Sequence, residues 1–248
     1  MTHSEFDYVV VGGGSAGCCV AGRLSEDQHT SVCLLEAGGP DNSVFVRAPL
    51  GFAATASLNL NSWGYNTVPQ AGFKGRKGFQ PRGKVMGGSS SINAMVYTRG
   101  NARDYDSWAA LGNPGWSFQD VLPYFKKSEN NECFGATDYR GVGGPLNVSF
   151  LRSPSPLNQL FMKACNEQGI PSNPDYNGAQ QFGVSPGQVT QKGGERWNAA
   201  RAYIDPHRHQ SNLNVISHAH ATQIMFEGKR AVGIKYKVSG VNHEVRAR

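Results

Sequence analysis

No continuous apolar run in this 248-residue sequence approaches the roughly 20 residues that a membrane-spanning helix needs. The stretch before the first apolar run, residues 1–4, is too short for a secretory signal peptide. The five cysteines are odd in number and form no C-x-x-C pair, so we expect neither a disulfide framework nor a zinc site. These absences favour a reducing compartment and predict a cytoplasmic protein.

Two further absences exclude classes of function. The pattern G-x-S-x-G does not occur, so the run Ser89–Ser91 is not a hydrolase nucleophile. The net charge is +6, but no basic stripe interleaved with aromatic residues appears, and nucleic acid is therefore not an expected partner. The densest basic group indicates either a solvated face or attraction of phosphate near a cofactor; it consists of Lys74, Arg76, Lys77, Arg82 and Lys84.

Two close histidine pairs are compatible with metal ligation. They are His207 with His209 and His218 with His220, and residues two apart on a strand share one face. No acidic or cysteine partner clusters with either pair, so we expect exposed histidines and no metal site.

Glycine, in contrast, is abundant, with 31 of 248 residues against a usual share of about 7%. Gly12, Gly14 and Gly17 form G-x-G-x-x-G between an apolar strand at residues 6–11 and a helix-compatible segment at residues 15–24. In a βαβ unit the first glycine makes the tight turn, the second lets the backbone approach a pyrophosphate, and the third allows close helix–strand packing. The helix N-terminus attracts the phosphates.

Glu36 directly follows a second expected strand, residues 32–35, within reach of the same turn. An acid at this spacing is placed to accept hydrogen bonds from ribose hydroxyls. It would repel the 2′-phosphate of NADP, so FAD and NAD remain as cofactors. The alternative is a tight glycine turn that binds no nucleotide.

Small residues also dominate a second segment, residues 81–100. Gly87 and Gly88 would let the main chain pass against a flat ligand without a Cβ clash. The following Ser89–Ser91 supplies hydroxyl and N–H groups. From the residues alone, a second nucleotide-contact segment and a plain helix-capping turn stay equally open.

The rest of the chain predicts helices followed by strands. Helices are expected at residues 102–110, 117–128, 154–169 and 199–204, and strands at 213–217, 222–227, 231–237 and 243–246. The apolar faces of the second and third helices are Val121, Leu122, Tyr124 and Phe125, and Leu157, Leu160, Phe161 and Ala164. The four tryptophans are expected to pack rather than to stack on a substrate; they are Trp63, Trp108, Trp116 and Trp197.

The fold class that follows is α/β, and α+β in part. A Rossmann-like βαβ domain of the FAD/NAD(P)-binding kind is joined to an antiparallel β-meander made of the last four strands. Residues 41–65 give few signals, and residues 72–81 are predicted as a loop.

Together these residues resemble the glucose–methanol–choline (GMC) family of FAD-dependent oxidoreductases, over residues 6–248 and most of all its choline and aliphatic-alcohol dehydrogenase branch. The signature stretch is GKVMGGSSSIN at residues 83–93, continued by Tyr97 and Gly100. Supporting matches are NSW at 61–63, GW at 115–116, RWNAARAY at 196–203 and FEGKRAVG at 226–233.

The resemblance implies a cofactor and a reaction. The cofactor is non-covalent FAD, because Ile92 stands where covalently flavinylated relatives carry a histidine. The reaction is oxidation of a primary alcohol or choline to an aldehyde by hydride transfer to flavin N5, with an unidentified electron acceptor. The substrate is thus a small-molecule alcohol. Peripheral association at the inner membrane, through an electron-acceptor partner, is the alternative to a free cytoplasmic enzyme.

The resemblance also implies a set of cofactor-binding residues. The glycine turn would hold the pyrophosphate, and Glu36 the ribose. Gly87 and residues 93–95 would form the wall beside the flavin ring, and the main chain at Ala221 would meet the adenine. The expected residues are Gly12, Gly14, Ser15, Ala16, Gly17, Glu36, Ala37, Arg82, Gly87, Gly88, Ser91, Asn93, Ala94, Met95 and Ala221.

Length is the main departure from the family, whose members are more than twice as long. Their catalytic histidine and its partner fall in a C-terminal region without a counterpart in this sequence, so we assign no catalytic residue. We expect residues 1–150 to be the first part of an FAD-binding domain, 151–190 the first segment of a substrate domain, and 191–248 the second part of the FAD-binding domain, with the fold incomplete at the C-terminus.

The expected function is therefore the N-terminal, FAD-binding half of an FAD-dependent alcohol or choline dehydrogenase, inactive when alone. Two alternatives stay open. One is a catalytically silent FAD-binding fragment, and the other is an NAD-linked dehydrogenase.

Overall fold

The computed structural model describes residues 5–248, and the chain divides into two units. One unit contains the residues up to Ala94 together with Glu195–Arg248, and the other contains Met95–Gly194. The second unit is therefore inserted into the first along the chain. These divisions differ from the domain boundaries that the sequence predicts after residues 150 and 190, because residues 95–150 pack with 151–194. That these parts of the chain are an FAD-binding domain and a substrate domain stays a prediction.

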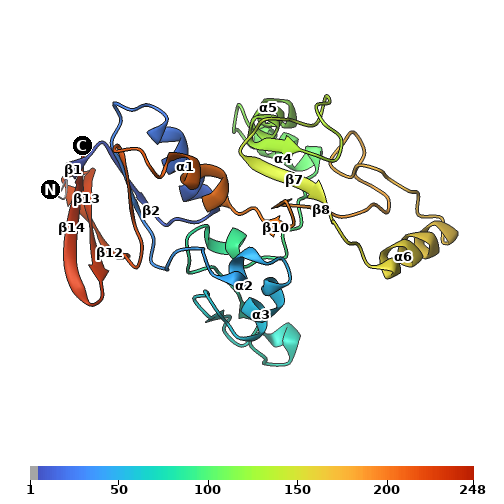
Figure 1. Ribbon diagram of the computed structural model, residues 1–248, viewed down its shortest axis with the longest axis horizontal. Coiled ribbons are helices and arrows are strands. Elements are labelled where there is room, and N and C mark those ends of the chain that lie inside the picture. The colour runs from blue at the N-terminus through green and yellow to red at the C-terminus, as the bar shows by residue number, and fades with distance from the viewer. Residues whose placement is uncertain (1–4) are drawn as a thin grey trace. The chain divides into compact units, whose positions relative to one another are not determined.

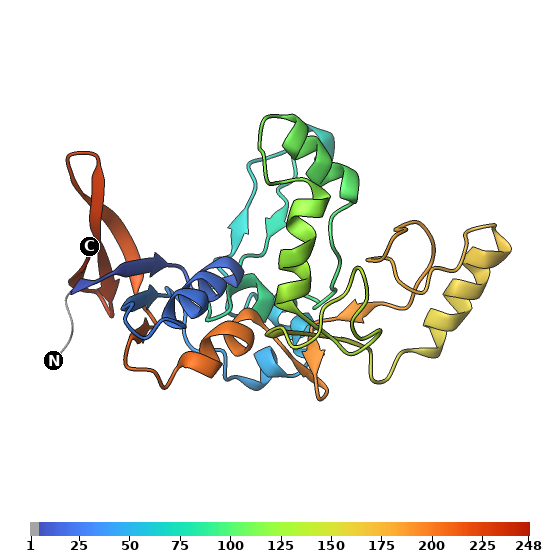
Figure 2. The same ribbon diagram turned by 90° about the horizontal axis from the view of Figure 1, so that it is seen from above.

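The first unit is built around the predicted βαβ motif. Strands β2 (Tyr8–Val11) and β3 (Val32–Leu35) pair in parallel, and helix α1 (Ser15–Ser25) connects them, which confirms the predicted elements. β3 is buried along its whole length, as expected for the middle strand of the sheet β11-β3-β2. α1 packs against the π-helical turn η3 (Ala200–Ile204), and both views show the two side by side (Figures 1 and 2).

Strand β11 (Leu213–Ile216) corrects the predicted meander. It pairs in parallel with β3, with Leu213 opposite Val32, and not with the strands that follow it. The true meander is β12 (His220–Glu227), β13 (Arg230–Val238) and β14 (Val241–Ala247). A four-residue apolar strand shows its β character in the sequence, but its partner depends on long-range packing.

The meander and the parallel sheet share one core. β1 (Glu5–Phe6) pairs with β14. The chain then leaves the meander sheet at Asp7, whose carboxylate Oδ2 accepts hydrogen bonds from the N–H (2.8 Å) and Oγ (2.6 Å) of Ser31. It continues as β2 of the parallel sheet. The core combines side chains of both sheets: Phe6, Cys33, Leu35, Ala219, Ile234, Tyr236 and Val245. These findings confirm the predicted fold class.

The stretch without strong signals holds two short helices, α2 (Val44–Arg47) and α3 (Gly51–Ser57). They are too short for a helical periodicity to be visible in the sequence. The predicted loop at residues 72–81 contains a 3₁₀ turn η1 (Ala71–Phe73) and strand β5 (Phe79–Gln80), which pairs with β4 (Tyr65–Asn66). The remaining short elements of this unit are η2 (Gly88–Ser91), β10 (Glu195–Arg196) and η4 (Asp205–His207).

The second unit contains the three other predicted helices, α4 (Ala102–Ala110), α5 (Phe118–Ser128) and α6 (Pro156–Glu167). α4 and α5 begin with capping boxes, in which Asn101 pairs with Asp104 and Ser117 with Asp120. The strands are β6 (Glu129–Asn131), β7 (Leu146–Phe150), β8 (Gln188–Val189) and β9 (Gln191–Lys192). Within residues 5–248, no helix has the length and apolar content to cross a membrane.

Some side chains of two predicted apolar helix faces are exposed, although Val121, Leu122 and Phe125 of α5 are half-buried. Tyr124 of α5 is 71% exposed, and Leu157, Leu160 and Phe161 of α6 are 62–70% exposed. Helical spacing identifies a face, but it does not say whether another element covers that face. The implied burial of these side chains is therefore wrong for residues 5–248.

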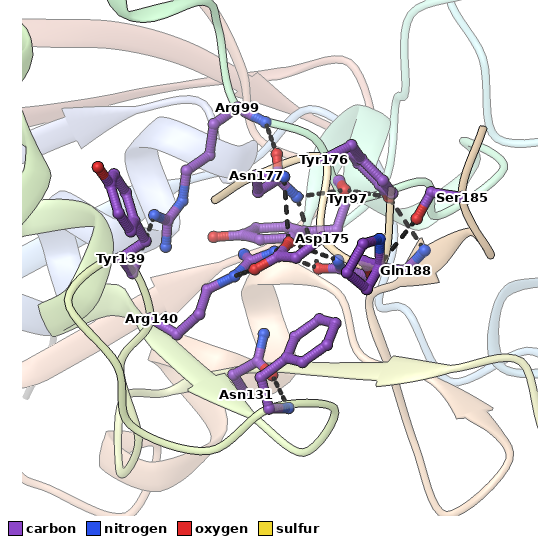
Figure 3. Close-up of polar contacts among 12 residues, drawn as sticks. Tyr97, Arg99, Asn131, Tyr139, Arg140, Asp175, Tyr176, Asn177, Ser185 and Gln188 are labelled. Carbon is purple, nitrogen blue, oxygen red and sulfur yellow. Dashed lines mark hydrogen bonds and ion pairs between the residues drawn. The ribbon is translucent and has the colours of Figure 1, made fainter. Parts of the chain in front are cut away.

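A buried polar network stabilises the second unit (Figure 3). Arg140 is fully buried; its Nη1 donates to Glu129 (3.0 Å), its Nη2 to Gln188 (2.7 Å), and its Nε to Asp175 (2.9 Å). Arg99 donates to the other oxygen of Glu129 (2.7 Å). Burial alone would raise the pKa of Asp175, but the hydrogen bonds from Arg140 and Gln188 outweigh it and lower that pKa below its usual value.

Candidate functional site

The first unit has a cavity of about 390 Å³ at the carboxyl ends of β2 and β3, between Val11 and Leu35. This is the edge of an open parallel sheet where ligands bind. Eight of the residues predicted from the sequence line it: Gly12, Gly14, Ser15, Glu36, Ala37, Arg82, Gly88 and Ala221. The fold thus brings together predicted residues from both ends of the chain.

The three glycines of the turn have the surroundings that their predicted roles require. Gly12 has a φ of +94°, a conformation that favours glycine. A Cβ at Gly17 would lie 1.8 Å from the carbonyl oxygen of Gly12, so only glycine lets α1 pack this close to the turn. A Cβ at Gly14 would meet nothing within 4 Å. Gly14 therefore borders an open cradle that a side chain would fill.

The start of α1 offers hydrogen-bond donors to that cradle. The first bond of the helix runs from the N–H of Cys18 to the carbonyl of Gly14 (2.9 Å). The amides of residues 14–17 precede it and have no partner within the helix, as at any helix N-terminus. Together with the helix dipole they favour an anion such as a pyrophosphate.

Glu36 faces the same cavity, and the backbone amides of Gly13 and Gly38 hold its carboxylate. Its Oε2 accepts from the N–H of Gly13 (2.8 Å) and its Oε1 from the N–H of Gly38 (2.7 Å). Each oxygen keeps further acceptor capacity for a ribose hydroxyl. Burial raises the pKa of Glu36 above its usual 4.5, although these two backbone donors and the charge of Lys84 oppose the rise.

The second glycine segment contacts the first through the backbone. The N–H of Gly87 donates to the carbonyl of Gly13 (2.7 Å), and a Cβ at Gly88 would lie 2.6 Å from the Cα of Gly14. Gly88 and Ser89 line the cavity. Only a 3₁₀ turn follows Gly87, and the next helix, α4, begins at Ala102. No α-helix begins at this turn, so the position favours a cofactor contact over a helix-capping turn, and the contact itself stays a prediction.

The other predicted residues lie outside the cavity. Ala16 is exposed on α1, and Ala94 is exposed after the second glycine segment. Ser91 is buried, donates to the carbonyl of Met86 (2.7 Å) and accepts from Asn198. Met95 lies in the second unit, where its carbonyl accepts from the N–H of Thr190. The cofactor roles of Ala16, Ser91, Ala94 and Met95 stay predictions.

Asn93 lines a second, smaller cavity of about 110 Å³ in the first unit, together with Ile92 and Ser89. Ser89 also lines the larger cavity, so the two adjoin. Of the predicted flavin-side residues, Asn93 thus borders a compartment separate from that of the predicted pyrophosphate and ribose residues.

Trp63 and His220 line the larger cavity, although the sequence predicts packing for one and simple exposure for the other. Their rings meet edge to face at 5.5 Å, and Lys84 Nζ lies 4.6 Å from the centroid of the Trp63 ring. The N-S-W triplet of the family resemblance was the available signal for Trp63. Within residues 5–248, no three His, Cys, Asp or Glu side chains are grouped to hold a metal ion.

Two dehydrogenases are similar to this chain in amino-acid sequence. The chain is 44% identical to an alcohol dehydrogenase (acceptor) of Pseudomonas putida, over 97% of the chain and 44% of that protein. It is 42% identical to an oxygen-dependent choline dehydrogenase of Brucella anthropi, over 98% of the chain and 44% of that protein. The chain therefore spans less than half the length of these relatives.

Two solved structures are similar over nearly the whole chain. Pyridoxine 4-oxidase from Mesorbium loti has a TM-score of 0.91 at 32% identity, covering 98% of this chain and 48% of its own. An FAD-dependent oxidoreductase from Chaetomium thermophilum has a TM-score of 0.89 at 33% identity, covering 98% of this chain and 44% of its own. The family profile described as GMC oxidoreductase matches residues 6–248. Because that match covers nearly the entire chain, the chain belongs to the GMC oxidoreductase family.

Proposed function

We propose that this chain binds FAD and forms the cofactor-binding half of an oxidoreductase that acts on the CH–OH group of a small alcohol. The observation that carries the proposal is the open cradle at Gly14, which shares one cavity with the Glu36 carboxylate and the N-terminus of α1. Family membership and the named activities of the similar proteins, alcohol and choline dehydrogenases, support the alcohol.

The residues of the larger cavity fit the adenosine and pyrophosphate part of FAD. The amides of residues 14–17 donate to the pyrophosphate, and Arg82 adds positive charge at the cavity wall. Glu36 accepts from the ribose hydroxyls. The main chain at Ala221 meets the adenine. Trp63 adds an apolar ring to the same wall.

Asn93, which lines the smaller cavity, borders the position that we assign to the flavin end. FAD, when bound, supplies the acceptor for the hydride of the alcohol, and the protein binds and orients it. Ile92 borders this cavity and has no nucleophilic atom, so the cofactor is held without a covalent bond. We assign no proton-removing residue within residues 5–248.

FAD binding is the first test. The purified chain is mixed with FAD, FMN or NAD, freed of unbound ligand by gel filtration, and measured by visible absorbance and by titration calorimetry. We expect FAD to be retained, and FMN to bind more weakly because it lacks the adenosine half. Acid precipitation should release all the yellow colour. Retention of NAD without flavin would favour the NAD-linked alternative, and colour in the precipitate would contradict non-covalent binding.

Turnover separates an oxidoreductase from a silent FAD-binding fragment. The FAD-loaded chain is assayed with primary alcohols and choline, with an artificial dye as electron acceptor. We expect no turnover by the 248-residue chain, because no proton-accepting residue is assigned within it. Turnover comparable with that of a full-length relative would contradict this assignment and direct the search to its own histidines. A cytoplasmic location and peripheral membrane association stay predictions.

A further inference from the structure

Arg196 is a fully buried cation held only by neutral oxygens. Its Nε donates to the carbonyl of Val46 (2.8 Å). Its Nη1 donates to the carbonyl of Ser90 (3.0 Å) and to Oδ1 of Asn93 (2.9 Å). Its Nη2 is buried without a hydrogen-bond partner in the described part of the chain. The site therefore contains a guanidinium with one end unsatisfied.

The charge of Arg196 has no direct counter-ion. The buried Arg99 and Arg140 pair with Glu129, whereas Arg196 forms no ion pair with a carboxylate of residues 5–248. Burial accordingly lowers the pKa of Arg196 to about 10, and it stays protonated at neutral pH. An isolated buried charge is costly to a fold. A ligand that carries or gains negative charge would offset that cost.

The cation lies directly behind the segment that we assign to the flavin. Residues 196–199 contact residues 90–93 through further hydrogen bonds: Asn198 Nδ2 donates to Ser91 Oγ (2.8 Å), and the N–H of Ala199 donates to Ser90 Oγ (3.0 Å). Asn93, which lines the smaller cavity, accepts directly from Arg196. The buried Asp41 contacts this cluster through Asn198 (2.9 Å). One hydrogen bond thus separates the guanidinium from a cavity-lining side chain.

We propose that Arg196 is a positioning residue that favours the reduced, negatively charged form of FAD by acting through Asn93. This inference rests on the proposed function. The oxidised ring is neutral, whereas the two-electron-reduced ring readily loses a proton and becomes an anion. The alcohol supplies the two electrons as a hydride and becomes the aldehyde, and its hydroxyl proton is lost. A fixed cation in a poorly solvated site attracts the anion and has little effect on the neutral ring.

The hydrogen bond to Asn93 adds to this effect. A cationic donor on Oδ1 polarises the carboxamide, so that the amide N–H group becomes a stronger donor. It also fixes the carboxamide orientation before the cofactor binds. The role therefore requires both the charge at position 196 and a donor that reaches Asn93.

The test compares affinities for oxidised FAD and for dithionite-reduced FAD, measured without oxygen. The variants are Arg196→Gln, which keeps a donor but removes the charge, and Arg196→Lys, which keeps the charge. The matched control is Arg201→Gln, because Arg201 is already neutralised by Glu195 at 2.7 Å. Far-UV circular dichroism verifies that each variant folds.

We expect the wild-type chain to bind reduced FAD roughly tenfold tighter than oxidised FAD, which corresponds to about 30 mV for a two-electron couple. Arg196→Gln should lose this preference, and Arg196→Lys and Arg201→Gln should keep most of it. Equal weakening of both redox forms in Arg196→Gln would overturn the proposal, since a purely structural role predicts that result.

Two further outcomes keep the proposal testable if Arg196→Gln does not fold. A wild-type chain that binds both redox forms equally would overturn it, and so would loss of the preference in a folded Arg196→Lys. A wild-type chain that binds neither form would instead contradict the proposed function itself.

Discussion

At the scale of single residues, Gly14 and Gly17 show how differently two glycines of one motif can respond to substitution. Gly14 has extended backbone (φ −80°, ψ −166°), which a β-branched residue tolerates, and open space where its Cβ would stand. We expect Gly14→Val to change the free energy of unfolding by only about 0.5 kcal/mol and to abolish FAD binding. Denaturant unfolding and FAD titration measure the two effects.

Gly17→Val is the matched comparison for that experiment. Its Cβ would lie 1.8 Å from the carbonyl oxygen of Gly12, so the helix must move away from the turn. We expect a loss of about 3 kcal/mol or more in the free energy of unfolding. A Gly14→Val chain that bound FAD as tightly as wild type would remove Gly14 from the proposed site.

Glu36 makes FAD binding sensitive to pH. Only the ionised carboxylate accepts from both ribose hydroxyls and from Gly13 and Gly38, and burial raises its pKa above 4.5. Affinity should therefore be full above this raised pKa and fall as the pH drops through it. In Glu36→Gln the side-chain NH₂ group points at the N–H of Gly13 or Gly38, so one of these hydrogen bonds is lost. The binding of FAD should therefore weaken by about 1.5–3 kcal/mol. Titrations between about pH 4 and pH 8 should show a flatter profile for the variant.

The sequence predicts local site residues better than distant ones. Gly12, Gly14 and Glu36 are predictable because one strand–turn–helix–strand motif fixes their spacing. Trp63 and His220 reach the cavity only through long-range contacts. Neither residue lies in a motif whose spacing would point to the glycine turn.

At the scale of elements, the Arg140 network links β6, β8 and the loop that contains Asp175. Arg140→Leu removes the cation that neutralises Asp175, and breaking a buried ion pair costs about 3–5 kcal/mol. We expect a loss of that order in urea unfolding of the second unit. Lys163→Leu is the control, because its pair with Glu167 is exposed and 3.9 Å long; it should change stability by about 0.5 kcal/mol or less.

Acid unfolding gives a second measurement of the same network. The pKa of Asp175 is lower in the folded chain than its usual 3.8. Its stabilising contribution is therefore complete above pH 3.8 and is lost as the pH falls through the lower folded value. Arg140→Leu should remove this acid-dependent part. An unchanged acid profile would show that Asp175 does not depend on Arg140.

The limits of prediction for elements have two physical sources. α1, α4 and α5 are predictable because caps and periodicity are local signals. The pairing of β11 with β3 is not, since no local feature of a four-residue strand specifies a partner far away in the chain. The apolar stripe of α6 is periodic, but its exposure depends on which neighbours are present.

At the scale of the whole molecule, the exposed side chains of α6 favour self-association. Leu157, Leu160 and Phe161 form an apolar patch on one short helix. We expect Leu160→Lys to reduce concentration-dependent association in light scattering without lowering stability, because the side chain is 62% exposed. Leu111→Lys is the control: Leu111 is 80% exposed but follows α4 and does not belong to the α6 patch, so association should be unchanged. Equal effects of the two variants would contradict a role for the patch.

The late return of β11 to β3 has a consequence for biosynthesis. About 180 residues, including the entire inserted unit, separate the end of β3 from the start of β11. At synthesis rates of about 5–20 residues per second, β11 is synthesised roughly 10–40 s after β3. The wall at Ala221 emerges from the ribosome later still. FAD present during translation therefore meets an incomplete cavity until Ala221 has emerged, and we expect firm cofactor binding only after that point.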